Sequence, residues 1–363
     1  DLLFGRLQDP RDAARCRYRL CDLLFIAFCT LLANGEDFVD MEEFARQRAD
    51  WLKQHIDLSA GIPSHDTFNR VFGMLSVEGM RECLAADGRR LLEHLDQKQI
   101  CLDGKKLRGS SPKSKGNQGL YLLNAWVAEN RLCVGQERVL DKSNEITAIP
   151  KVLDQLEIQG SVVSIDAMGC QVEIAEQIIS KGADYFLAVK GNQPGLAEEI
   201  EDAFRFEARS AEWFAEEWQR DHGRREKRRT HCLDASAYLS EEQLTRWPHL
   251  KSIVRVQSLR ELTGKDKEQT ERYYISSETA EAKYFNYLAR GHWGIENHLH
   301  WHLDVTFKED QARVRTANAP QNLSAMRKIA LQRLQAPKDK KSLKKRRFAA
   351  SLNKDYLMDI LKS

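Results

Sequence analysis

The chain has 363 residues, enough for two domains or for one core that carries a large insertion. Charged residues make up 30% and hydrophobic residues 42%, which is typical of a globular protein and excludes wholesale disorder. Because 56 Lys and Arg face 54 Asp and Glu, the formal net charge is only +2, and any nucleic-acid partner must be recognised by local basic clusters.

Residues 1–95 are predicted to form a helical N-terminal domain. Apolar residues recur at helical spacing in three stretches: 20–32, 41–52 and 80–95. Between the last two, Ser64 follows Pro63 as a helix-start signal and precedes a short amphipathic helix. A short helix after a tight turn fits a helix-turn-helix that reads DNA and an ordinary helical bundle equally well.

After the helical region, short apolar strands alternate with helices. The expected order is three strands, a helix, a strand, a helix and a strand, with a hairpin turn at Glu129–Asn130. Two of these strands end on acids, ICLD on Asp103 and SVVSID on Asp166. Ligands of open α/β sheets bind at the carboxyl ends of strands, so we expect both acids at a binding edge. Residues 96–189 are therefore assigned to the first part of a mixed α/β domain.

Residues 190–280 break this alternation and are predicted to be a β-rich insertion. An acidic stretch, 196–218, precedes a basic one, 220–229. Two alternating stretches, 250–259 and 271–277, are expected to form strands of a separate β layer.

A long helix with an apolar stripe follows the insertion and places Glu296 beside its buried face. This helix belongs to residues 281–335, predicted to be the last part of the α/β domain. Residues 336–363 form a basic tail, for which we expect a solvated run, with DNA binding as the alternative. The longest uncharged apolar run is too short for a membrane span, and eight scattered cysteines without a CxxC pair predict free thiols. We therefore expect a cytoplasmic protein without a membrane partner.

The acids Asp103, Asp166 and Glu296 together suit a divalent-cation site. Ionised carboxylates are almost never buried unpaired, and hard oxygen ligands favour Mg²⁺ or Mn²⁺. Two ions about 3.5–4 Å apart would stabilise both the attacking and the leaving oxygen of a phosphoryl displacement. Taken singly, each acid also fits a structural role, as a turn cap, a helix cap or a salt-bridged helix residue. Only their combination favours a site.

Longer motifs are spread over nearly the whole chain: PSHDTFNRVF, ICLDGKKLRGS, SIDAMGCQ, FLAVKGNQP, DHGRREKRR and HWGIENHLHWHLDVTFKEDQARVR. Together they resemble bacterial insertion-sequence transposases of the DDE type, in the H-repeat-associated, or ISAs-type, branch. The resemblance implies an RNase H-like mixed sheet flanked by helices, with the DDE triad on Asp103, Asp166 and Glu296. It also implies a β-rich insertion at 190–280 and an N-terminal associated domain that binds DNA.

The function that this resemblance implies is DNA transposition by a mobile element. Such an enzyme binds terminal inverted repeats, acts as a Mg²⁺- or Mn²⁺-dependent endonuclease with two ions, and joins the 3′-OH to target DNA. We expect a homodimer assembled on double-stranded DNA at the bacterial nucleoid. Two alternatives remain open: a domesticated or decayed transposase that only binds DNA, and a metal-dependent nuclease without strand transfer.

Basic and amide side chains near the acids are candidates for DNA contact, because a nearly neutral chain must concentrate its phosphate affinity in patches. For the arginines of the insertion, neutralising the acidic stretch is the alternative. The candidates are Lys105, Lys106, Arg108, Lys190, Asn192, Gln193, Arg224, Arg225, Arg228, Arg229, Arg290 and His292.

Related transposases carry a Tyr-x2-Arg-x3-Glu-x6-Lys signature around the last acid. In this chain His292 occupies the arginine's place and Leu303 the lysine's place. Tyr287 and Arg290 keep their mutual spacing but lie two residues upstream of register. We therefore expect altered handling of the DNA end, and Asp304 is the reserve candidate for the third ligand.

Overall fold

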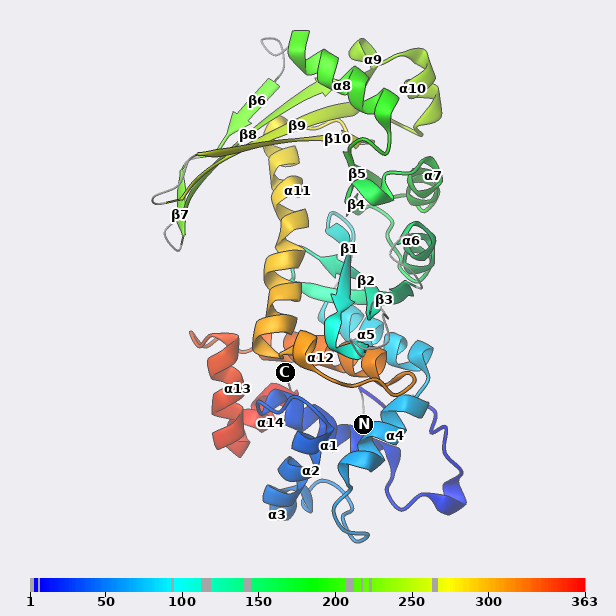
Figure 1. Ribbon diagram of the computed structural model, residues 1–363, viewed down its shortest axis with the longest axis vertical. Helices are drawn as coiled ribbons and strands as arrows, with labels where there is room; N and C mark the ends of the chain where they lie inside the picture. The colour runs from blue at the N-terminus through cyan, green and yellow to red at the C-terminus, as the bar shows by residue number, and fades with distance from the viewer. Residues whose placement is uncertain are drawn as a thin grey trace.

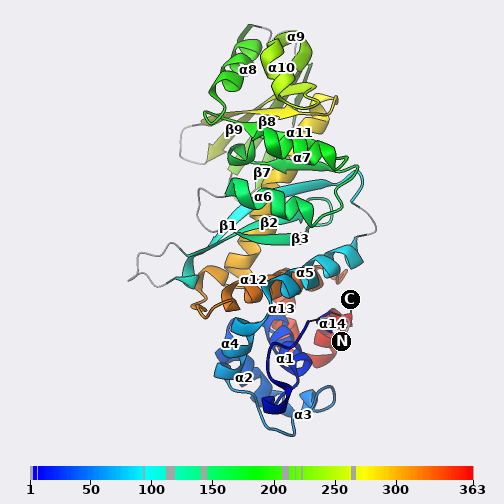
Figure 2. The same ribbon diagram turned by 90° about the vertical axis from the view of Figure 1, so that its right-hand side faces the viewer.

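The computed structural model describes residues 3–362 except 6, 93–94, 112–118, 140–144, 207–211, 217, 222–223 and 263–266. Along the long axis of the molecule, a helical lobe that holds both termini is followed by a sheet that curves away at its far end (Figure 1). Helix α11 (Ala282–Ile295) runs along one face of this sheet, and α6 (Glu145–Asp154) and α7 (Val172–Ser180) cover the other face (Figures 1 and 2).

The N-terminal helices follow the predicted pattern. They are α1 (Leu20–Leu32), α2 (Phe38–Gln47), α3 (Ala49–Leu52), α4 (His65–Met74) and α5 (Val77–Leu91). Ser64 caps α4, since its side-chain oxygen accepts a hydrogen bond from the backbone N–H of Thr67. The predicted helix start is therefore confirmed.

The core of the helical lobe does not end at residue 95. Three C-terminal helices complete it: α12 (Ala319–Gln335), α13 (Leu343–Leu352) and α14 (Lys354–Lys362). Met326 and Ile329 of α12 belong to the same apolar cluster as Leu24 and Phe72. Because segments from both ends of the chain share one core, the 1–95 region is not a self-contained packing unit.

The stretch expected to be a solvated basic tail is packed at two of its basic residues, whereas its lysines, Lys338, Lys340, Lys341, Lys344 and Lys345, are exposed. Arg347 is fully buried and donates hydrogen bonds to the carbonyl oxygens of Leu31, Gly35 and Thr306. Arg346 donates to carbonyl oxygens at the end of α12 and just beyond it. The expectation of a solvated run is wrong for these two arginines, because their guanidinium groups satisfy carbonyl oxygens that would otherwise lack partners.

The sheet has ten strands in the order β3-β2-β1-β4-β5-β10-β9-β8-β6, with β7 paired to β8. The strands are β1 (Gln99–Leu107), β2 (Leu120–Val127), β3 (Leu132–Val139), β4 (Val162–Ile165), β5 (Asp184–Val189), β6 (Glu212–Ala215), β7 (Gln219–Asp221), β8 (Arg224–Asp234), β9 (Ser252–Leu262) and β10 (Glu268–Ser276). β1, β4 and β5 are parallel, and the remaining pairs are antiparallel. The predicted RNase H-like mixed sheet and the β2–β3 hairpin are confirmed.

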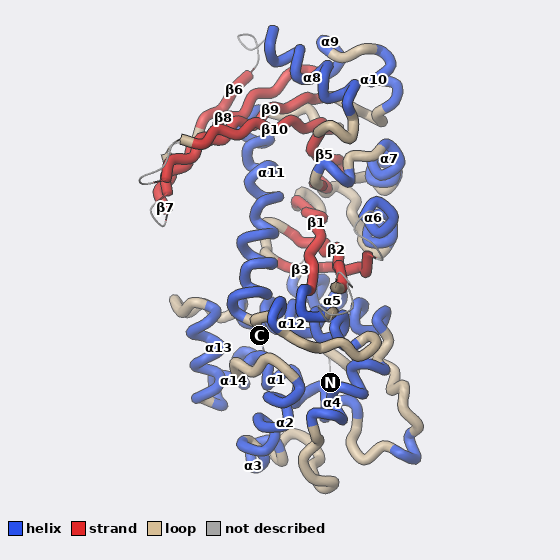
Figure 3. Tube along the Cα trace, viewed as in Figure 1, coloured by secondary structure: helices blue, strands red, loops and turns tan. Residues whose placement is uncertain are grey.

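The insertion is not a separate β layer. Strand β10 pairs antiparallel with β5, so β10, β9 and β8 extend the sheet without a break (Figure 3). This pairing satisfies the edge of β5, which would otherwise present unpaired backbone groups. The insertion also contains α8 (Pro194–Phe206), α9 (Ala235–Tyr238) and α10 (Glu241–Arg246).

The prediction of free thiols is confirmed. All eight cysteines are free thiols, and six of them are buried. Within the described parts of the chain, the helices are too short or too polar to cross a lipid bilayer.

Candidate active site

Asp103 lies inside β1, at the point where the pairing with β4 stops. Leu102 is the last residue of β1 that pairs with β4, whereas β2 continues and places Asn124 opposite Asp103. The predicted strand end is therefore wrong, since β1 runs on to Leu107. The longer strand β2 supplies the hydrogen-bond partners that keep β1 extended beyond the acid.

Asp166 directly follows β4, as predicted. Its Oδ1 accepts hydrogen bonds from the backbone N–H groups of Met168 (3.1 Å) and Gly169 (3.4 Å) and caps a short 3₁₀ helix. The structural role is thus observed. It is compatible with ligand binding, because an ionised carboxylate has about four acceptor sites.

Glu296 lies where α11 changes its winding. The backbone continues from Ile295 as two π-helical segments, Glu296–His300 and His302–Thr306. Glu296 is exposed, while its neighbour Ile295 is buried, which agrees with the predicted apolar stripe. π-helical turns inside α-helices are rare and occur frequently at functional sites.

The three acids interact electrostatically. Burial, together with the charges of Asp166 and Glu296, raises the pKa of Asp103 to about 7. The N–H of Gly104, 2.9 Å from Asp103 Oδ1, opposes this rise. A carboxylate whose pKa rises this far lacks sufficient positive charge nearby, and a divalent cation would supply it.

The oxygen donors suit Mg²⁺ chemically, but their present spacing is too wide for a closed site. Among the described residues, no three carboxylate, imidazole or thiol groups lie close enough together to hold a metal ion. Binding an ion therefore requires the side chains of Asp103, Asp166 and Glu296 to move toward one another. All three are positioned on the same sheet edge or on the helix that crosses it.

His300 is a further neighbour of Asp103. Its Nδ1 lies 3.5 Å from Asp103 Oδ2, and its Nε2 lies 3.4 Å from Asn124 Nδ2. Burial lowers the pKa of His300 to about 3, so the ring is neutral at pH 7. The wider π-helical turn sets the direction of this side chain, which regular helical spacing does not predict.

Glu145 of α6 is a fourth acid near Asp103, and its charge adds to the rise in the pKa of that residue. A Cβ atom at Gly104 would lie 2.8 Å from Glu145 Oε1 and 2.6 Å from the Tyr121 hydroxyl oxygen. A larger residue at position 104 would require the Tyr121 and Glu145 side chains to shift, so this position favours glycine.

Lys105 is not available to DNA. Its buried Nζ lies 2.5 Å from Asp304, 3.5 Å from Asp310 and 4.0 Å from Glu309. The prediction of a DNA contact is wrong because these carboxylates already neutralise its charge. Asp304, the reserve ligand, is engaged in the same cluster.

Lys106 and Arg108 remain accessible beyond this cluster. Lys106 is exposed, as expected for alternate residues of a strand. Arg108 is also exposed, and its Nε lies 3.2 Å from Asp310. Both stay candidates for phosphate contact.

The loop after β5 is tied to the loop that carries Asp166. Asn192 Nδ2 donates to the carbonyl oxygen of Ala167 (2.6 Å), and Gln193 Nε2 donates to that of Cys170 (2.9 Å). Gln193 is buried, so its predicted DNA contact is wrong. Asn192 and Lys190 are exposed and remain candidates.

Glu216 of the insertion gathers several polar groups around α11. It lies 3.4 Å from Arg228 and 3.0 Å from Arg290, and it accepts a hydrogen bond from Asn286 (2.7 Å). Arg228 also pairs with Glu226 at 2.6 Å. The alternative interpretation, neutralisation of the acidic stretch, therefore holds for Arg228, and Arg290 is partly neutralised in the same way.

The other arginines of the basic stretch differ in their surroundings. Arg225 is half-exposed and lies 3.5 Å from Glu261. Arg229 is exposed beside the Trp213 ring, and no carboxylate of the described residues pairs with it. The side chain of Arg224 lies outside the described part of the structure.

His292 packs against the sheet. Its Nδ1 lies 3.0 Å from the Ser164 hydroxyl of β4, and burial lowers its pKa to about 4. A neutral ring in this position would not neutralise a phosphate charge, so a DNA contact by His292 stays a prediction that would depend on hydrogen bonding alone. The hydroxyl of Tyr287 donates to Glu129 Oε1 (2.8 Å), which ties α11 to the hairpin turn.

Comparison with known proteins gives two family matches. Residues 94–332 match the family described as "Transposase DDE domain", and residues 3–86 match the family described as "DDE_Tnp_1-associated". The protein named "Putative transposase YncI" from Escherichia coli O157:H7 is 36% identical, over 98% of this chain and 93% of its own. The "H repeat-associated putative transposase YhhI" from Escherichia coli strain K12 is also 36% identical, over 98% of this chain and 95% of its own.

A solved structure is also similar to this chain. The piggyBac transposase synaptic complex with hairpin DNA aligns with a TM-score of 0.43 and 11% identity, over 97% of this chain and 76% of that one.

Proposed function

The chain belongs to the DDE transposase family, and we propose that it is a Mg²⁺-dependent DNA transposase. It would bind the terminal inverted repeats of its element, hydrolyse a phosphodiester bond and join the freed 3′-OH to target DNA by transesterification. Mn²⁺ could replace Mg²⁺. We further propose that the protein acts as a homodimer when assembled on double-stranded DNA.

The observation that carries this proposal is the burial of Asp103 beside the charges of Asp166 and Glu296, which together raise the pKa of Asp103 to about 7. These three carboxylates would hold two ions. When bound, the metal would supply activation of the attacking oxygen and stabilisation of the leaving oxygen. The chain's own task is to position these groups, and the neutral His300 ring beside Asp103 would orient that carboxylate.

The proposal is tested by incubating the protein with DNA that carries its element's end, together with target DNA and Mg²⁺. Cutting followed by joining supports the transposase. Cutting without joining supports a metal-dependent nuclease, and binding without cutting supports a domesticated or decayed transposase. Either of the last two results overturns the proposal.

The insertion provides a prediction with a built-in control. We expect R229A to flatten the slope of log affinity against log salt by about 0.9, since each phosphate contact on duplex DNA contributes about that much. R228A should leave the slope unchanged and lower the melting temperature, because Glu216 and Glu226 would lose a partner. DNA titration at several salt concentrations and thermal melting measure both effects. An unchanged slope for R229A would remove Arg229 from the DNA-binding surface.

A further inference from the structure

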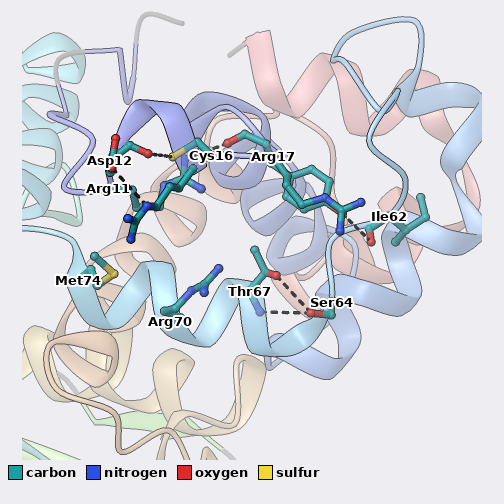
Figure 4. A pocket seen from close by; sticks show the side chains of 11 residues that line it. Arg11, Asp12, Cys16, Arg17, Ile62, Ser64, Thr67, Arg70 and Met74 are labelled. Atoms are coloured by element: carbon teal, nitrogen blue, oxygen red, sulfur yellow. Dashed lines mark hydrogen bonds and ion pairs between the residues drawn. The ribbon is translucent and has the colours of Figure 1, made fainter.

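A cleft of about 660 Å³ opens in the helical lobe, far along the chain from the three acids. Its two walls are the segment before α1 and the helix α4 (Figure 4). Four arginines and one aspartate line it: Arg11, Arg15, Arg17, Arg70 and Asp12. The cleft therefore carries a local excess of positive charge on a nearly neutral chain.

Internal hydrogen bonds fix the wall before α1. Arg11 donates to both carboxylate oxygens of Asp9 (2.8 and 2.7 Å) and to the carbonyl oxygen of Tyr18 (2.9 Å). The Tyr18 hydroxyl lies 3.2 Å from the carbonyl oxygen of Ile62, in the loop that leads to α4. Arg11 and Tyr18 are thus structural, and they hold the cleft open without a ligand.

The charges that remain free come from both walls. Arg17 and Arg70 are exposed, and no carboxylate of the described residues pairs with either. Arg17 makes one long hydrogen bond, 3.5 Å, to the carbonyl oxygen of Ala60. Arg15 forms a long ion pair with the exposed Asp12 (3.6 Å), and its side chain is 88% exposed, so the pair leaves most of the guanidinium group open to solvent. Arg70 points from α4 toward the opposite wall (Figure 4).

We propose that this cleft binds the phosphodiester backbone of duplex DNA. Guanidinium groups match phosphate oxygens in a bidentate geometry. Arg17 and Arg70 present such groups from the two walls of the cleft. Among the described residues that line the cleft, Tyr18 is the one aromatic ring. Its hydroxyl fixes it, so it offers little for base stacking, and a single-stranded ligand is disfavoured. This inference rests on the proposed function, because it names where the DNA substrate contacts the helical lobe.

Backbone contacts position a duplex without reading its bases. We therefore expect the cleft to strengthen binding to element ends and to unrelated duplexes of equal length by the same factor. Sequence preference must arise elsewhere.

The test compares two double variants of the full chain. R17A/R70A should flatten the slope of log affinity against log salt by about 1.8, since two phosphate contacts are lost. The control, R46A/K53A, removes two positive charges from the same lobe, but these already pair with Glu42 (2.7 Å) and Asp50 (3.2 Å). The control slope should match that of the wild-type protein. Fluorescence anisotropy with labelled duplexes measures the slopes, and thermal melting verifies that both variants fold.

The outcomes separate this inference from the proposed function. If the wild-type protein binds duplex DNA and R17A/R70A shows the same salt slope, the cleft does not bind DNA, whereas the transposase proposal is unaffected. Equal flattening of the salt slope by both double variants also overturns the cleft proposal, because the loss of any two positive charges from the lobe would then explain the result. Absence of duplex binding by the wild-type protein overturns both proposals. Flattening by R17A/R70A alone, on both kinds of duplex, is the supporting result.

Discussion

Replacing Asp103 with Asn is expected to reduce Mg²⁺-dependent cleavage of element ends by about a thousandfold or more. The variant loses a charged metal ligand, and removing even one group that stabilises transition-state charge costs about 10²–10³ in rate. DNA binding should change less than about twofold, since phosphate contacts are made by other residues. A single-turnover cleavage assay alongside a binding titration measures both effects.

The same variant has a second readout, the melting temperature without metal. The Asn side chain removes the repulsion with Asp166 and Glu296, so D103N should melt at a higher temperature than the wild-type protein. Mg²⁺ should then stabilise the wild-type protein much more than D103N. D202N is the matched control, because Asp202 is half-exposed and pairs with Arg205 on α8, away from the three acids. Wild-type cleavage rates in D103N would show that the acids are wrongly assigned.

Replacing Lys105 with Ala should lower the free energy of unfolding by about 3–5 kcal/mol, the usual effect of removing one partner from a buried ion pair. Asp304, Asp310 and the buried Glu309 would lose their shared cation. K106A, one residue away on the exposed side of β1, should change the free energy of unfolding by less than about 0.5 kcal/mol. Urea unfolding of both variants measures the difference.

Lys105 also distinguishes a structural charge from a DNA contact. A K105A protein that unfolds like the wild type but shows a flatter salt dependence of DNA binding would restore the original prediction. Equal destabilisation by K105A and K106A would show that the ion pairs of Lys105 with Asp304, Asp310 and Glu309 do not stabilise the fold.

Much of the fold could be predicted from local sequence. The β2–β3 hairpin, the helix after Ser64 and the strand that ends before Asp166 all depend on residues close together in the chain. Strand and helix periodicity, turn residues and caps determine such elements. The pairing of β10 with β5 could not be predicted in this way, because it joins segments far apart in sequence.

Some contacts of the site could not be predicted either, because they join distant segments or depend on an irregular helical turn. The motif DGKK gives no sign that Lys105 points into the protein, since its carboxylate partners lie about two hundred residues downstream. His300 approaches Asp103 through a π-helical turn that regular helical spacing does not foresee. Arg347 belongs to a run of basic residues that composition alone describes as solvated, yet its partners are carbonyl oxygens of other helices.

The central claim is that Asp103, Asp166 and Glu296 form one divalent-metal site. Its most direct test is Mn²⁺ binding to the full chain on element-end DNA, followed by electron paramagnetic resonance. We expect D103N, D166N and E296Q each to weaken Mn²⁺ binding by at least about tenfold, because changes even outside the ligand shell cost 10–100-fold. D202N should bind Mn²⁺ like the wild-type protein. Unchanged Mn²⁺ affinity in E296Q would contradict a shared site and leave the two aspartates without their third ligand.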